Sequence, residues 1–154
     1  MKIYSSSFET GGYIPASHAQ TGNNVNPPLS IENAPSEARS LVLIMDDPDA
    51  PKGTFTHWVL FNVDPKLSEI REGEVPPGAL QGTNSRNEAK YMGPKPLYGE
   101  HRYFFKLFAL DDKLDLPNGA TRGEVEKALQ SHVIETAQAM GRYSAVEKMV
   151  GADR

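Results

Sequence analysis

Three stretches of the chain carry apolar residues in the continuous or alternating patterns that are typical of β-strands. Residues Ser40–Asp46 form a near-continuous apolar run, as expected of a strand that is buried on both faces. Residues Phe55–Val63 are rich in aromatic and β-branched side chains, and a proline follows closely. In His101–Asp111 both alternating faces are largely apolar, so this strand should also lie mostly inside. A weaker strand is expected within residues 2–8.

One helix is predicted near the C-terminus. Thr121 and Glu124 have the spacing of a capping box. Apolar residues then recur at helical spacing as far as Met140, and Gly141 is placed to end the helix. A shorter helical turn is expected within residues 65–73. Because 12 prolines and 13 glycines interrupt the chain, the pattern favours a mainly β protein, an antiparallel two-sheet β-sandwich with a peripheral C-terminal helix.

The composition fits a single domain over residues 1–154, which is long enough to bury a core. No stretch approaches the roughly 18 apolar residues of a membrane span, and the N-terminus lacks the apolar segment of a signal peptide, so a cytoplasmic location is expected. The absence of cysteine excludes disulfides, thiolate nucleophiles and cysteine-based zinc sites. A net charge of -4 without a block of Lys or Arg argues against nucleic acid as the main partner.

Acidic residues gather between the first two strong strands. Asp46, Asp47 and Asp49 end the first apolar run, and Pro48 and Pro51 keep the residues before them extended. These carboxylates are therefore held at the end of a strand rather than in a helix. A solvent-facing turn explains the same residues without any function, since Asp and Pro are common in turns.

His57 opens the second strand, ten residues after Asp47. Strict alternation places it on the same face as Val59 and Phe61, with Trp58 on the opposite face. That separation is enough for the chain to leave one strand, turn and return beside it. An Asp–His contact would raise the histidine pKa and fix its tautomer. The alternative to a functional role is a buried histidine whose ring nitrogens form hydrogen bonds within the core.

The segment 91–103 brings a third group of polar residues. Gly93 and Pro94 begin a rigid loop that leads to His101 and Tyr103, which point the same way in an extended chain. A glycine N–H, an imidazole and a phenol can all donate to an anion. A Pro/Gly loop followed by an aromatic strand is the structural alternative. Two histidines and two carboxylates together form a nearly neutral cluster, suited to a phosphate monoester or a zwitterionic headgroup.

The motif "DPDAP", followed ten residues later by "HW" and then by "GPKPLYGEHRYFFKLFAL", resembles the phosphatidylethanolamine-binding protein family, which includes the Raf kinase inhibitor-like proteins. The compact length, "GGYIP…GNNVNPPLSI" and "GRYSA" resemble its bacterial and archaeal branch. The resemblance spans most of the chain. Each motif alone is weak evidence, whereas the set in this order is specific.

The resemblance implies a β-sandwich with a shallow pocket for phosphate-like anions and phospholipid headgroups. It implies a cis bond between Ala50 and Pro51 that aims Asp49 inward, a Gly93 N–H that donates to the anion, and a structural ion pair for Arg102. The implied ligand-binding residues are Asp47, Asp49, His57, Gly93, Pro94, His101 and Tyr103.

The expected function is non-catalytic binding of a phosphate-type anion or phospholipid headgroup, with no cofactor and no metal. A kinase or protease inhibitor, or a scaffold, would use the same pocket. A small hydrolase is a further alternative, because Asp and His could act as acid and base or hold a metal. The chain lacks the HExxH, G-x-S-x-G and P-loop motifs. The prokaryotic branch is compatible with a homodimer.

Overall fold

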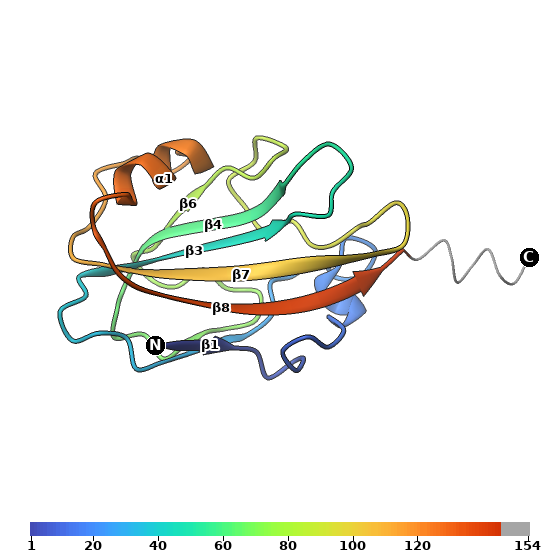
Figure 1. Ribbon diagram of the computed structural model, residues 1–154, viewed down its shortest axis with the longest axis horizontal. Coiled ribbons are helices and arrows are strands. Elements are labelled where there is room, and N and C mark those ends of the chain that lie inside the picture. The colour runs from blue at the N-terminus through green and yellow to red at the C-terminus, as the bar shows by residue number, and fades with distance from the viewer. Residues whose placement is uncertain (146–154) are drawn as a thin grey trace, which may run out of the picture.

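The structure, a computed structural model, describes residues 1–145 (Figure 1). Its strands are β1 (Lys2–Tyr4), β2 (Leu29–Glu32), β3 (Ser40–Asp47), β4 (Phe55–Val63), β5 (Glu69–Ile70), β6 (Leu80–Gly82), β7 (Glu100–Leu110) and β8 (Val133–Ser144), and its helices are the 3-10 turn η1 (Ala16–His18) and α1 (Arg122–Leu129). A five-stranded sheet has the order β6-β4-β3-β7-β8, and a three-stranded sheet has the order β1-β2-β5. All pairs of neighbouring strands are antiparallel. The prediction of a mainly β, two-sheet protein is confirmed. Residues 146–154 of the predicted single domain lie outside the described part.

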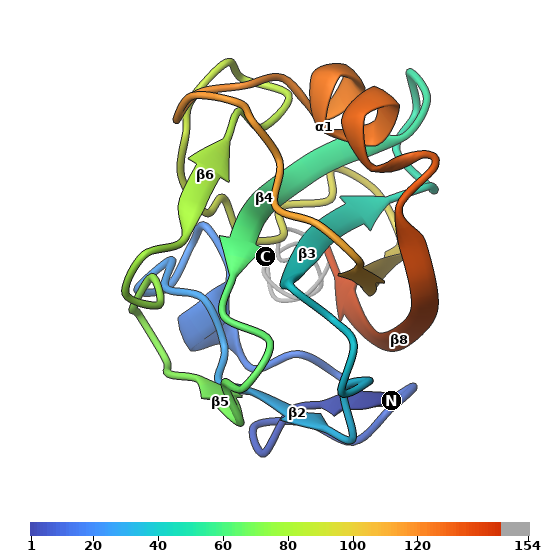
Figure 2. The ribbon, with the colours of Figure 1, turned by 90° about the vertical axis from the view of Figure 1, so that its left-hand side faces the viewer.

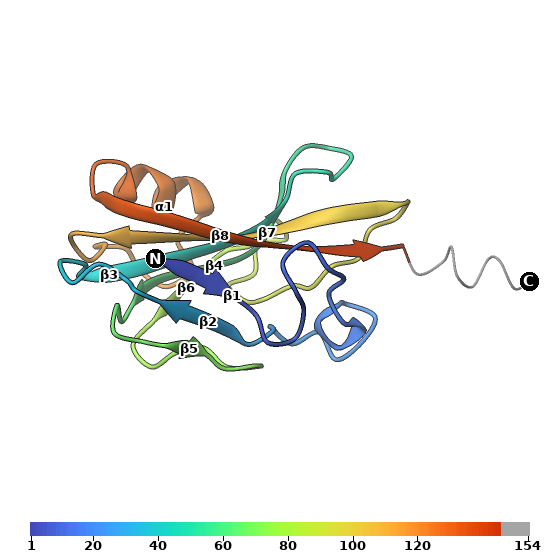
Figure 3. The ribbon, with the colours of Figure 1, turned by 60° about the horizontal axis from the view of Figure 1, so that its bottom comes forward.

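Two hydrophobic cores hold the layers together, and these layers are visible in the end-on view and in the tilted side view (Figure 2, Figure 3). The first core lies between the two sheets and includes Trp58 and Phe105. The second lies between the other face of the large sheet and α1, and includes Ile44 and Val125. Strand β3 has a core on each face and a neighbour on each edge, so all eight of its residues are buried. Among residues 1–145, no helix is long and apolar enough to cross a membrane.

The three strong strand predictions are confirmed to within one residue at each end. The weak N-terminal strand forms but is shorter than predicted. The short helical turn predicted within residues 65–73 is wrong, because that segment turns at Asp64–Leu67 and then adds the short strand β5 to the small sheet.

The predicted C-terminal helix is correct only in its first half. The capping box at Thr121 and Glu124 is present, but α1 ends at Leu129. Residues Val133–Ser144 instead form β8, which pairs with β7 along its whole length. Their β-branched residues and their small residues at every second position suit a strand against β7, and this tertiary pairing outweighs the helical spacing.

Gly141 lies within β8 and does not end a helix. A Cβ at this position would lie 2.5 Å from Cγ1 of Ile14 and 2.8 Å from Cε2 of Phe8. The absence of a side chain therefore lets the N-terminal segment pack closely against β8. This segment also bonds to the β8 backbone through Gly11 and Ile14.

A β-bulge at His57 overturns the predicted alternation in β4. Met45 pairs with Trp58 and Asp46 pairs with Thr56, so His57 is an extra residue in its strand. As a result, His57 and Trp58 both lie on the side of the small sheet, whereas Val59 belongs to the core under α1. The expectation that His57 shares a face with Val59 is therefore wrong.

The peptide bond between Ala50 and Pro51 is trans, as are all the others within residues 1–145. The cis bond implied by the family resemblance is thus not present. The loop that carries these residues turns instead at Gly53, which has a φ of 103° and a backbone N–H that donates to Ala50 O.

Candidate functional site

A cavity of about 510 Å³ opens at the end of the large sheet where β3 ends and where β4 and β7 begin. Antiparallel pairing brings these three strand ends together, and the loops that follow or precede them form the walls. Of the predicted residues, Asp47, His57, His101 and Tyr103 line this cavity. The structure therefore brings together two histidines, one carboxylate and one phenol from three strands.

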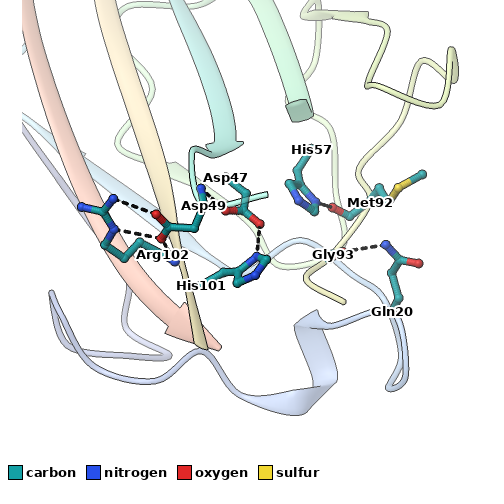
Figure 4. Close-up of polar contacts among 8 residues, drawn as sticks. All are labelled: Gln20, Asp47, Asp49, His57, Met92, Gly93, His101 and Arg102. Atoms are coloured by element: carbon teal, nitrogen blue, oxygen red, sulfur yellow. Dashed lines mark hydrogen bonds and ion pairs between the residues drawn. The ribbon is translucent and has the colours of Figure 1, made fainter. Parts of the chain in front are cut away.

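Asp47 and His101 form a close polar contact at the cavity (Figure 4). The two residues are buried, and Nδ1 of His101 lies 2.6 Å from Oδ2 of Asp47. Because a carboxylate only accepts hydrogen bonds, Nδ1 is the donor, and Asp47 fixes the orientation of the ring. Oδ1 of Asp47 accepts a second hydrogen bond from the backbone N–H of Asp49 at 2.8 Å.

Asp49 does not lie in the cavity, contrary to the expectation. Its carboxylate accepts hydrogen bonds from the Arg102 backbone N–H and Nε at 2.9 Å and from Nη2 at 2.8 Å (Figure 4). The hydrogen bond and charge of Arg102 lower the pKa of Asp49 to about 2. The predicted structural ion pair of Arg102 is confirmed, and its partner is Asp49. This pair fastens the loop between β3 and β4 to the start of β7.

Asp46, the first of the three acids, faces the opposite side of the sheet. Its Oδ2 lies 3.0 Å from Nζ of Lys106 and 2.8 Å from Nη1 of Arg122, while Oδ1 is buried with no hydrogen-bond partner among the described residues. Successive side chains in a strand point to opposite faces, so the side chains of Asp46 and Asp47 lie on opposite sides of the sheet. Asp46 therefore contributes an ion pair beneath α1 and not a cavity group.

His57 enters the cavity because the bulge turns its side chain towards β7. Its Nδ1 lies 2.6 Å from the carbonyl oxygen of Met92 and must be the donor, which leaves Nε2 without a partner among the described residues (Figure 4). The His57 and Tyr103 rings pack edge-on, with their centroids 5.3 Å apart. Burial lowers the pKa of His57, and the Met92 carbonyl and the charge of Asp47 only partly oppose this effect.

Tyr103 packs its phenol ring against both imidazoles. The ring centroids lie 5.3 Å from His57 and 6.5 Å from His101. Burial, followed by the negative charge of Asp47, raises the pKa of Tyr103. The phenol therefore stays protonated and offers an O–H group at the cavity wall.

Gly93 and Pro94 are buried behind the cavity and do not line it. The Gly93 N–H donates to Oδ1 of Asn24 at 2.8 Å, so it is not a free donor for an anion. A Cβ on Gly93 would lie 2.0 Å from the carbonyl oxygen of His18. The Gln20 side chain donates to the Gly93 carbonyl group (Figure 4), and the Gln20 backbone N–H donates to the Pro94 carbonyl group. This pair therefore supports the wall through close backbone packing.

Three cations at the cavity were not predicted. Lys52, Arg86 and Lys95 line it, and none of them makes an ion pair within residues 1–145. Lys52 follows β3, Lys95 lies in the loop before β7, and Arg86 lies in a turn held by the side chain of Asn84. These residues are isolated in the sequence and resemble ordinary surface charges. Only the fold reveals that three separate loops bring them to one place.

The cavity combines two imidazole Nε2 atoms that are available to a ligand, one phenol and three cations around a single carboxylate. This set suits an anion such as phosphate, which accepts charge-assisted hydrogen bonds from protonated imidazole, lysine and arginine. No cluster of three or more metal-ligating side chains occurs in the described part of the chain.

Comparison with known proteins identifies the family of this chain. The family model described as Phosphatidylethanolamine-binding protein matches residues 4–144. The chain therefore belongs to the phosphatidylethanolamine-binding protein family, as the motifs indicated.

Archaeal proteins resemble most of the chain. A UPF0098 protein of Methanothermobacter thermautotrophicus is 43% identical over 148 residues, which cover 93% of this chain and 98% of the relative. One from Pyrococcus abyssi is 45% identical over 148 residues and covers 90% of this chain and 83% of the relative.

Solved structures share the fold. The crystal structure of a phosphatidylethanolamine-binding protein homologue from Chlamydia trachomatis matches with a TM-score of 0.89 and 38% identity, covering 93% of this chain and 96% of that one. Escherichia coli YbcL, described as a member of the mammalian family, matches with a TM-score of 0.86 and 26% identity, covering 93% and 97%.

Proposed function

We propose that the protein is a non-catalytic binding protein for phosphate-type anions, either phosphomonoesters or phospholipid headgroups. The observation that carries this proposal is the pair of histidines at the cavity. Met92 and Asp47 fix Nδ1 of His57 and His101, so each ring can offer only Nε2 to a ligand. When protonated, each ring can donate from Nε2 to an anion in the cavity.

The protonated phenol of Tyr103 adds a neutral donor, and the cations at the mouth attract an anion to the cavity. A site that recognises one phosphate on an open surface should bind with micromolar to millimolar affinity, about 4 to 8 kcal/mol. Family membership supports a binding role. Inhibition of a kinase or protease, the homodimer and the cytoplasmic location stay predictions.

Calorimetric titration with ethyl phosphate tests this proposal. The variant His101→Ala should lose binding at least tenfold, because it removes one charged donor, which contributes about 1.5 to 3 kcal/mol. His132→Ala is the matched control, since His132 also pairs through Nδ1 with a carboxylate, Asp111, but lies exposed and away from the cavity. Equal affinity of the two variants, with both still folded, would contradict the proposal.

A further inference from the structure

We propose that Arg122 of α1 is a positioning residue for the cavity, which acts through Thr56 and holds the β-bulge that turns His57 into the cavity. The helix lies over the face of the large sheet that points away from the small sheet (Figure 2). The consequence for ligand affinity rests on the proposed function. The effect on the histidine ring can be measured without any ligand.

The bulge makes the position of His57 depend on which residues of β4 are held on the α1 face. Val59 belongs to the core beneath α1, and strict alternation from it would carry His57 to the same face, away from the cavity. Instead, His57 and Trp58 both lie on the side of the small sheet, and Thr56 faces α1. Holding both Thr56 and Val59 on the α1 face therefore keeps the extra residue between them.

Arg122 holds Thr56 from the first turn of α1. Its Nη1 donates to Oγ1 of Thr56 at 3.1 Å and lies 2.8 Å from Oδ2 of Asp46, which pairs with Thr56 across the two strands. One guanidinium nitrogen thus bridges β3 and β4 beside the bulge. Val125, three residues further along α1, belongs to the same core as Val59. The helix and the core beneath it therefore secure β4 on both sides of the bulge.

The buried charge of Asp46 keeps the guanidinium group of Arg122 over the strands. The Asp46 side chain is fully buried, and its Oδ1 has no hydrogen-bond partner among the described residues. Within that part of the chain its charge is met at Oδ2, by Arg122 and by Lys106 at 3.0 Å. Loss of a partner from a buried carboxylate is strongly destabilising, so Arg122 stays on Asp46 and does not extend into solvent.

The backbone of Thr56 is fixed at the same point. Its N–H donates to Oγ of Ser85 at 2.8 Å, and its carbonyl oxygen accepts from the Ser85 N–H at 2.9 Å. Ser85 lines the cavity. Thr56 is therefore tied to the cavity wall through its backbone and to α1 through its side chain, and it connects the two faces of the sheet.

Two substitutions of Thr56 separate the hydrogen bond from the packing. Thr56→Val removes the acceptor oxygen, keeps the branched shape and leaves the ion pair between Asp46 and Arg122 in place. Thr56→Ser keeps the oxygen. NMR of the ligand-free protein measures the nuclear Overhauser effect between the rings of His57 and Tyr103, whose centroids lie 5.3 Å apart. Thr56→Val should lose much of this signal, and Thr56→Ser should retain it.

Binding of ethyl phosphate should follow the same order. Thr56→Val should lower the affinity about threefold to tenfold, because the ligand must then restore a position that one hydrogen bond no longer holds. Arg122→Met removes the bridge altogether and should cause the larger loss of both signal and affinity. It also destabilises the protein, because Asp46 loses a charged partner.

The matched control is Leu129→Ala, at the other end of α1. Leu129 belongs to the same core beneath the helix as Val59 and Val125, but it lies outside the bridge to Thr56. The variant should also destabilise the fold, because a buried side chain is shortened. It should leave both the signal between the rings and the affinity unchanged.

The outcomes are distinct. The inference is refuted if Thr56→Val folds and keeps the wild-type signal, if Thr56→Ser loses as much signal as Thr56→Val, or if Leu129→Ala loses it as well. Weaker binding with an unchanged signal would also refute an action through His57. If Thr56→Val loses the signal but the wild type does not bind ethyl phosphate, the positioning role stands and the proposed function fails.

Discussion

The affinity for an anion should rise as the pH falls, because His57 must gain a proton to donate to the ligand. The residue is 4% exposed, and burial holds the pKa of its imidazole below the ordinary value of 6.5. The surrounding groups only partly oppose this effect. The groups that face the ring or share its cavity are the Met92 carbonyl, Asp46, Asp47, Phe55, His101, Tyr103 and the cations Lys52, Arg86 and Lys95.

The structure sets the size of the effect. Nδ1 of His57 already carries a proton, which it donates to Met92 O at 2.6 Å, so only Nε2 can gain one. Uptake of one proton per bound anion gives a tenfold change in affinity per pH unit, or about 1.4 kcal/mol. This slope holds above the pKa of the free protein and levels off below it.

Calorimetry with sulfate measures this slope at constant ionic strength, because sulfate keeps its double charge throughout the range. The comparison with His57→Gln isolates this residue from the other histidines. The wild type should gain about tenfold per unit as the pH falls, and the variant should be clearly less sensitive. The same slope in both proteins would refute the role of His57.

The stability of the ligand-free protein should depend on pH in the opposite direction and fall as the pH falls. Because folding lowers the pKa of His57, the unfolded chain binds a proton below pH 6.5 that the folded chain does not yet bind. His57 therefore reduces stability progressively as the pH falls from about 6.5 towards its folded pKa. Sulfate should offset this loss in a thermal melt, and His57→Gln should remove it.

Four further substitutions test the cavity and the packing of the fold. Asp47→Asn removes the carboxylate that orients a histidine and should weaken phosphate binding about tenfold in calorimetry, with unfolding still cooperative. Gly93→Ala should destabilise the fold by about 1 to 3 kcal/mol in denaturant melts, because its Cβ would lie 2.0 Å from the His18 carbonyl. Gly123 lies in α1, and a Cβ there would be 3.9 Å from its nearest neighbouring atom. Gly123→Ala should therefore stabilise the fold by up to about 1 kcal/mol. Trp58→Ala should cost about 3 to 5 kcal/mol in the same melts because the side chain is fully buried; an unchanged midpoint would contradict its place in the core.

Local patterns in the sequence predicted the elements that local physics dominates. The apolar run of β3 and the capping box of α1 are examples, and both formed as expected. The apolar spacing of residues 133–140 predicts a helix, although their small residues at every second position also suit a strand. The pairing of β8 with β7 decides between them, and that contact joins segments that no local pattern connects.

In the candidate site, too, local patterns predicted some residues, and long-range contacts decided the rest. The sequence indicated Asp47, His57, His101 and Tyr103, and the structure brings them to one cavity. The position of Asp49 outside the cavity could not be predicted from the sequence, because it depends on a long-range ion pair with Arg102.

The bulge at His57 depends on the register between β3 and β4, which alternation alone does not contain. The three cations at the cavity, Lys52, Arg86 and Lys95, are isolated in loops and carry no local signal. Their convergence follows only from how the loops meet at the strand ends.

The most direct test of anion binding is an NMR titration of all four histidine side chains with ethyl phosphate. His57 and His101 should shift together and saturate with one dissociation constant. His18, whose ring lies between Val25 O and Ser7, and His132, on the surface, should not respond. If His57 and His101 stay unchanged, or if all four histidines shift alike without saturation, the cavity is not an anion-binding site.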